Sequence, residues 1–190
     1  MNSNIIRLAE ATDLPIIMQL VASAKAIMRK NGNQNQWNDG YPSENVIMED
    51  IQNGSCRIIM HGNTVVGSFV MKAGPDPTYS NIYNGRWLDD KPYYVIHRIT
   101  SREDAHGIFE EMLDYCFNIS HNIRIDTHKD NTIMRHLLEK NGFKYCGIIH
   151  IANGDERMAY QKVAGKRETT ITCDETTHSV SSCGNEPRDI

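Results

Sequence analysis

The stretch Asn131-Thr132-Ile133-Met134-Arg135-His136-Leu137-Leu138-Glu139-Lys140-Asn141-Gly142-Phe143 holds an amphipathic helix together with its stop signal. Four apolar residues recur at helical spacing and are expected to face inward: Ile133, Met134, Leu137 and Leu138. Glycine readily adopts the left-handed conformation that ends a helix, so Asn141-Gly142 is the expected end. The pattern therefore predicts a helix over Asn131–Lys140.

Two strand–helix units meet at this point of the chain. They comprise a strand over Tyr93–Thr100, a loop over Ser101–Gly107 and a helix from Ile108, then a strand over Asn122–Thr127 and the helix that Asn131 opens. Free backbone N–H groups at a helix start, together with the helix dipole, form an anion site. Gly107 lets a ligand approach the backbone closely. The first unit therefore predicts an anion-binding loop.

The remaining elements follow from apolar periodicity and turn residues. We expect strands over Ile5–Ala9, Cys56–His61, Thr64–Ala73, Lys144–Ile151 and Glu156–Val163, a helix from a Thr12 or Asp13 cap towards Met28, and a helix over Val46–Ile51 capped by Ser43. Gly74–Pro92 is predicted to be a loop. The element order β-α-α-β-β-β-α-β-α-β-β predicts an α/β (α+β) fold around a mixed sheet.

Bulk properties narrow the function. The formal charge of −4 argues against a nucleic-acid partner, which requires a basic surface. We expect no secretory signal and no membrane partner, because no uninterrupted apolar run approaches the ~18 residues of a span. Five cysteines without a C-x-x-C pair favour reduced thiols and a cytoplasmic location. Histidine spacing of the metal-binding kind is absent from the sequence, so we expect no metal site.

Residues 4–163 resemble the GNAT superfamily of acyl-CoA-dependent N-acetyltransferases. Asn131-x-x-Met134-x-x-x-Leu138-x-x-x-Gly142-Phe143 is similar to that family's N-x-x-A-x-x-x-Y-x-x-x-G-F block, and Arg7-Leu8-Ala9-x-x-x-Asp13-Leu14-Pro15 to its opening. The resemblance implies the GNAT fold, with about 6–7 strands and about four helices. It also implies acetyl transfer from acetyl-CoA directly to an amine of a small molecule or peptide, and a possible homodimer.

The family's pyrophosphate loop, R/Q-x-x-G-x-G/A, fits this chain in two registers. One lies on Asp104–Phe109, with Gly107 as the central glycine, and the other on Arg102-x-x-Ala105-x-Gly107. Negative charge at Glu103 and Asp104 would weaken CoA binding unless these side chains point away or pair with Arg102. The resemblance implies these co-substrate contacts: Ile99, Thr100, Ala105, His106, Gly107, Ile108, Asn131 and Arg135.

Three residues are candidates for catalysis: Asp126, His128 and His97. Asp126 falls where some family members carry a general-base Glu, and a backbone N–H near His97–Ile99 resembles the family's carbonyl donor. The alternatives are an ion pair of Asp126 with Arg98 or Arg124 or a helix cap, a core position for His97 and a plain loop position for His128. The alternative for Asn131 is a helix N-cap.

Other residues are candidates for the pocket of the acetyl acceptor and for the group that gives a proton to the leaving thiolate. Trp37 and Tyr41 are candidates to wall the acceptor pocket, the alternative being to anchor a loop. Leu138 stands where many family members have a tyrosine that protonates the leaving thiolate. Leucine cannot donate a proton, so Tyr41, Tyr94 or water is the expected donor. Cys116 lies on an apolar helix face and is expected in the core.

The chain is expected to form one domain over residues 1–163, followed by a polar, disordered tail over residues 164–190. Two other functions fit the same scaffold: a non-catalytic CoA-binding or regulatory module, and an interaction domain that no longer binds CoA.

Overall fold

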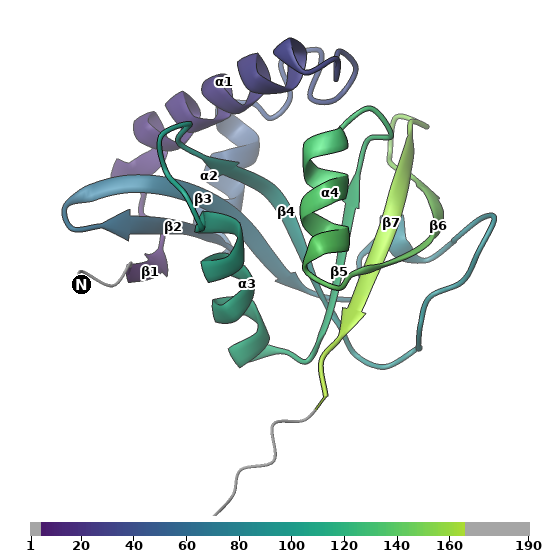
Figure 1. Ribbon diagram of the computed structural model, residues 1–190. Coiled ribbons are helices and arrows are strands. Elements are labelled where there is room, and N and C mark those ends of the chain that lie inside the picture. Colours follow the sequence, from purple (N-terminus) through teal and green to yellow (C-terminus); the bar gives the residue numbers. More distant parts are fainter. Residues whose placement is uncertain (1–4, 166–190) are drawn as a thin grey trace, which may run out of the picture.

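A seven-stranded mixed sheet with four α-helices makes up the computed structural model, which describes residues 5–165 (Figure 1). The strands are β1 (Ile5–Leu8), β2 (Cys56–His61), β3 (Thr64–Ala73), β4 (Tyr94–Ser101), β5 (Asn122–Thr127), β6 (Lys144–His150) and β7 (Glu156–Val163), in the spatial order β1-β2-β3-β4-β5-β7-β6. The helices are α1 (Leu14–Lys30), α2 (Glu44–Gln52), α3 (Ile108–Ile119) and α4 (Thr132–Lys140), with 3-10 turns η1 (Ala11–Asp13) and η2 (Pro77–Tyr79). The predicted order of strands and α-helices is confirmed.

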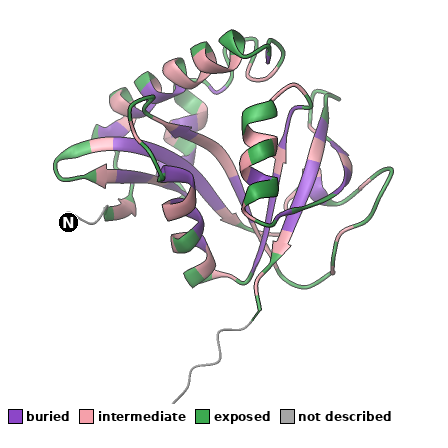
Figure 2. Ribbon diagram, viewed as in Figure 1, coloured by how far each residue is buried: buried purple, intermediate pink, exposed green. Residues whose placement is uncertain are grey.

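Two pairs of helices cover opposite faces of the sheet. One apolar cluster joins α1 and α2 to Ile58 and Val70, and a second joins α3 and α4 to their neighbours Ile59 and Phe69. Side chains of consecutive strand residues point to opposite faces, so each strand serves both clusters. Figure 2 shows the result, with buried strands between helices whose outer faces are exposed. The 74–92 loop covers a third cluster, centred on Tyr79.

Two local expectations need correction. Ile133 does not face the core: its side chain is 44% exposed, because the first turn of α4 lies beside the cleft described below, and only Leu138 of that helix is fully buried. Asp13 does not cap α1 through its side chain. Its carboxylate instead accepts from Arg7 and from the backbone N–H of Glu10, which closes η1. Ser43 does cap α2, accepting from the N–H of Val46.

The sheet opens between its two parallel strands. β4 and β5 pair only at Tyr94 with Ile123 and at Val95 with Arg124, and they separate beyond that point (Figure 1). On its other edge β4 carries a β-bulge, because the register against β3 shifts by one residue between Thr100 and His97. Within the bulge Arg98 has a φ of 51°, in the left-handed region. A bulge redirects side chains and leaves one residue out of the ladder, so β4 bends away from β5.

Among the helices of residues 5–165, the stretch Ala11–Lys30 is long and apolar enough to cross a membrane by length and composition. A helix packed on a sheet passes the same test, and here Ile17, Leu20 and Val21 of α1 are buried.

Candidate active site

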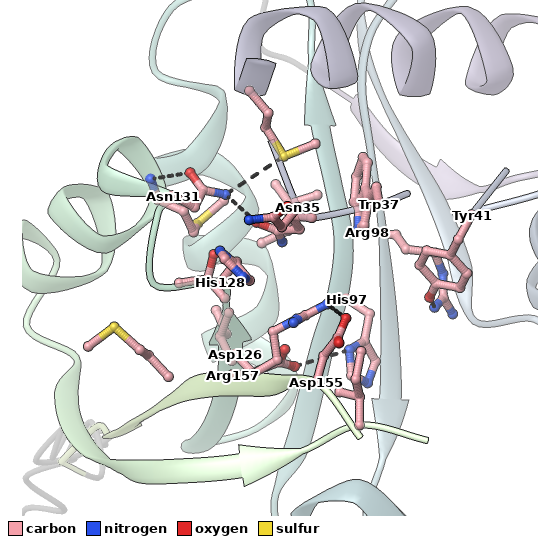
Figure 3. A pocket seen from close by; sticks show the side chains of 18 of the residues that line it. Asn35, Trp37, Tyr41, His97, Arg98, Asp126, His128, Asn131, Asp155 and Arg157 are labelled. Atoms are coloured by element: carbon pink, nitrogen blue, oxygen red, sulfur yellow. Dashed lines mark hydrogen bonds and ion pairs between the residues drawn. The ribbon is translucent and has the colours of Figure 1, made fainter. Parts of the chain in front are cut away.

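A cleft of about 1370 Å³ occupies the space between the diverging strands. Its lining includes residues 96–101 of β4, residues 125–129 at the end of β5, the segment from the end of α1 to Tyr41, and the turn between β6 and β7. The first turns of α3 and α4, Lys72 of β3 and the start of the 74–92 loop also contribute. The start of β7 contributes Arg157, which is buried and lies 3.7 Å from Asp155 of the preceding turn (Figure 3). Segments far apart in sequence therefore meet around one opening.

A network of polar side chains lies on the floor of this cleft. The imidazole of His97 is placed between two carboxylates, with Nε2 3.2 Å from Asp76 and Nδ1 3.7 Å from Asp126 (Figure 3). The hydroxyl of Tyr79 donates a 2.6 Å hydrogen bond to Oδ1 of Asp126. His97 and Asp126 thus come together as the sequence led us to expect, and the cleft contains both. His97 is half-buried at the surface of the cleft and is not a core residue.

The surroundings of the network set its charges. Burial tends to raise the pKa of Asp76, but hydrogen bonds from His97 and Thr78 outweigh it and hold the pKa well below its usual range. Tyr79 is fully buried, and burial together with the neighbouring charge of Asp126 raises its pKa well above the ordinary value. Asp76 is therefore a carboxylate and Tyr79 a neutral hydrogen-bond donor at neutral pH.

The ion pairs considered for Asp126 do not form, because both arginines have other partners. Arg98 pairs with Asp50 at 2.6 Å. Arg124 is held between the rings of Trp87 and Tyr93, at 4.0 and 3.8 Å from their centroids. Burial lowers the pKa of Arg124, and its cation–π contacts compensate part of the cost of burying the charge. Asp126 does not cap α4 either, since Asn131 does.

His128 lies at the end of β5 and is buried, with its ring on the cleft (Figure 3). Its Nδ1 accepts a 3.2 Å hydrogen bond from the backbone N–H of Asp130. Burial, and then the charge of Arg157, lower the pKa of His128, so the ring is neutral at pH 7. With Nδ1 occupied as an acceptor, the neutral ring carries its hydrogen on Nε2 and acts there as a donor.

Asn131 connects two walls of the cleft. Its Oδ1 caps α4 by accepting from the N–H of Met134, and its Nδ2 donates to Gln36 at 3.0 Å (Figure 3). The N-cap alternative is thereby confirmed. Trp37 and Tyr41 both line the cleft, as expected of a pocket wall. The guanidinium of Arg135, in contrast, donates to the carbonyl of Lys129 and is not among the residues that line the cleft.

The first turn of α3 is open towards the cleft. Gly107, the N-cap, has a φ of 75° and makes no side-chain cap, and a Cβ placed on it would meet nothing within 4 Å. Arg102 donates two hydrogen bonds of 2.9 Å to the carboxylate of Asp104. This is one of the arrangements under which the negative charge of Asp104 is compatible with CoA binding. Ile99, Thr100 and Ile108 line the cleft, whereas Ala105, His106 and Gly107 lie just outside its lining. Uncapped N–H groups at a helix start suit a pyrophosphate.

Tyrosines near the cleft differ from the expectation. Leu138 is buried and Tyr94 packs against the core, so neither reaches the cleft, while Tyr41 does. Tyr145 of β6 also lines it and is 47% exposed. Cys116 is confirmed as a core residue, and burial raises the pKa of its thiol to about 12. No cluster of His, Cys, Asp or Glu suited to a metal occurs within the described residues.

Sequence reasoning missed Asp76 and Tyr79, and it considered Arg98 only as an ion-pair partner of Asp126. The Asp76-Pro77-Thr78 pattern is a turn signal that predicts a capping aspartate, and Asp76 does accept from the N–H of Thr78. It gives no hint that this loop folds back under β4. Arg98 follows His97 in an apolar strand, where a lone arginine has no distinguishing pattern.

The fold has many known relatives among solved structures, although neither the comparison with protein-family models nor that with curated proteins finds a match. A GNAT-family acetyltransferase from Streptococcus agalactiae is 34% identical, with a TM-score of 0.78 over 86% of this chain and 96% of that one. One from Listeria monocytogenes is 19% identical, with a TM-score of 0.64 over 84% and 94%. A Salmonella typhimurium structure solved with its cofactor acetyl-CoA is 12% identical, with a TM-score of 0.57 over 90% and 100%.

The fold and these relatives define an acyltransferase. The chain belongs to the GNAT family of acetyltransferases.

Proposed function

We propose that this chain moves an acetyl group from acetyl-CoA to the primary amine of a small molecule or peptide, inside the cleft between β4 and β5. One observation carries the proposal: the opening places the uncapped start of α3 and the His97–Asp126 pair on the walls of a single cleft. A direct transfer requires both partners in one site, with a group nearby that accepts the proton of the amine.

The start of α3 fits a CoA pyrophosphate. The N–H groups of Ile108 and Phe109 lie in the first turn, the helix dipole favours negative charge, and Gly107 leaves room for approach. We assign the 99–100 backbone and the Asn131 turn to the pantetheine arm, because both line the cleft. Bound acetyl-CoA would supply a thioester, whose carbonyl carbon is open to attack by an amine.

On the acceptor side, we assign Asp126 as the general base, acting directly or through a water. His97 holds it in place from one side and Tyr79 from the other. In the reaction the amine nitrogen loses a proton and bonds to the acetyl carbon, while the carbon–sulfur bond breaks and the thiolate leaves. A free thiol has a pKa of about 8.5, so water or the Tyr41 or Tyr145 phenol suffices to return a proton to sulfur.

Binding of CoA tests the co-substrate site separately from the chemistry. CoA binds the native state only, so it should raise the melting temperature, with about 2.7 kcal/mol of stabilisation at ~100 times its dissociation constant. Pantetheine, which lacks the pyrophosphate, should raise it much less. If millimolar CoA and acetyl-CoA leave the melting temperature unchanged, the proposal is wrong.

No observation favours the alternative of a non-catalytic CoA-binding module. A cytoplasmic location and a homodimer stay predictions; the buried free thiols of Cys56, Cys116 and Cys146 are in keeping with a reducing compartment.

A further inference from the structure

On one wall of the cleft, two positively charged side chains share a single carboxylate as their ion-pair partner. Asp50, buried in α2, lies 2.8 Å from Nζ of Lys72 and 2.6 Å from Nη2 of Arg98. Both cations line the cleft, and the lysine side chain is 38% exposed there. Asp39, the acidic residue nearest in the lining loop, is exposed and forms no ion pair within the described residues. The group of Lys72, Arg98 and Asp50 therefore carries one positive charge in excess.

Hydrogen-bond donors on the same wall are left without acceptors. Nη1 of Arg98 donates to the hydroxyl of Tyr41 at 2.6 Å (Figure 3). Because that oxygen serves as an acceptor, the O–H of Tyr41 is free to donate, and no described residue accepts from it. The side chain of Arg98 is nine-tenths buried, and its Nε has no partner in residues 5–165. This Nε is itself inaccessible from the cleft, so the donors that a ligand can reach on this wall are the hydroxyl of Tyr41 and Nζ of Lys72.

The same cleft also contains a carboxylate that can accept hydrogen bonds from an amine. His97 precedes Arg98 on β4, and consecutive Cα atoms are about 3.8 Å apart. The carboxylate of Asp126 uses Oδ1 for Tyr79, which leaves Oδ2 for an ammonium group. A cation-binding group and an anion-binding wall thus line the same cleft.

We propose that the acceptor is a compound of the amino-acid class, whose carboxylate binds at Lys72, Arg98 and Tyr41 while its amine lies at Asp126. This inference rests on the proposed function and narrows its substrate. A simple alkylamine leaves the excess charge of the wall unpaired, and a polyamine adds repulsion to it. The amino-acid carboxylate accepts from the free donors and balances the charge.

The proposal is tested with sets of three acetyl-acceptor compounds that differ only in the carboxylate. Release of CoA from acetyl-CoA is measured with alanine, lysine, phenylalanine and glutamate, each beside its amide and its decarboxylated amine. In at least one triple, kcat/KM should be about 10- to 100-fold higher for the amino acid than for the amide and the amine, the value of hydrogen bonds to a charged group. If amides and amines react as well as the acids, the inference fails and the proposed function stands. If CoA binds and no acceptor reacts, the inference fails as well.

Two variants then locate the carboxylate site. Lys72→Met keeps most of the length of the side chain and leaves Asp50 paired with Arg98. Tyr41→Phe removes only the hydroxyl. Each should reduce the ratio of kcat/KM between the acid and its amide by tenfold or more. Lys144→Met changes an exposed lysine outside the cleft and is the control. Thermal melts establish that each variant is folded. An unchanged ratio in both folded variants contradicts the assignment.

Discussion

At the scale of single residues, the surroundings of Asp126 support its proposed role as the base. Its carboxylate lies on the cleft, yet it forms no ion pair with Arg98 or Arg124, the two partners considered from the sequence. Its described partners are a histidine and a phenol, and neither neutralises it with a permanent charge. A base must keep a lone pair accessible and be held in place. The pairing of Arg98 with Asp50 and the aromatic clamp on Arg124 keep Asp126 available.

Tyr79→Phe probes this arrangement. The variant keeps the ring that stacks on Trp87, 5.5 Å away, and loses only the donor that stabilises the charged Asp126. We expect kcat to fall about tenfold, the value of one hydrogen bond of ~1.4 kcal/mol. We also expect the acidic limb of the pH–rate profile to move to higher pH.

The control for this variant is Tyr83→Phe, on an exposed residue of the same loop. A merely structural role for Tyr79 would lower the melting temperature and leave the pH–rate profile in place. That result would remove Asp126 from the acid–base step.

At the scale of elements, most of the architecture was predictable. Periodicity predicted seven strands and four helices, and β5 has the predicted bounds, Asn122–Thr127. Local signals sufficed because caps and stops such as Ser43 and Asn141-Gly142 act within a few residues. The exposed Ile133 shows the limit: helical spacing marks an apolar face but not whether a neighbour covers it.

The site was predictable only in part. Asp126, His97, Trp37 and Tyr41 were chosen by position relative to a motif and do line one cleft. The contacts that define their roles join residues far apart in sequence: 47 residues for Tyr79 with Asp126, and 57 for Arg98 with Tyr41. Strand alternation gives no information on such pairs. The bulge that turns Arg98 towards Tyr41 has no glycine to announce it.

At the scale of the whole molecule, the sheet consists of two parts joined by a short parallel contact. Four strands from β1 to β4 pair antiparallel on one side, and β5, β7 and β6 on the other. The short contact lets the parts diverge, and the cleft lies between them. The core is continuous beneath the opening, since one cluster contains residues from β2, α3, β5 and α4.

The domain boundary gives a prediction at this scale. β7 ends at Val163, and the N–H of Ala164 still donates to the carbonyl of His121. The predicted tail, from residue 164 onwards, otherwise lies outside the described residues 5–165. Because its composition is poor in apolar residues, deletion of residues 166–190 should leave the melting temperature and turnover almost unchanged. Deletion from Ala164 should cost at most about 1 kcal/mol, for one hydrogen bond. A loss of several degrees on the shorter deletion would show that the tail packs on the domain.

The most direct test of the account is the turnover of Asp126→Asn beside its affinity for CoA. The substitution keeps the size and removes the basicity, so kcat at neutral pH should fall about 10²–10⁴-fold while the dissociation constant of CoA changes less than twofold. Asp114→Asn, on the exposed side of α3, is the control and should behave as the wild type. Mass spectrometry of the acetylated amine confirms that CoA release reports transfer. Unchanged turnover and an unchanged pH–rate profile in a folded Asp126→Asn variant would contradict the account.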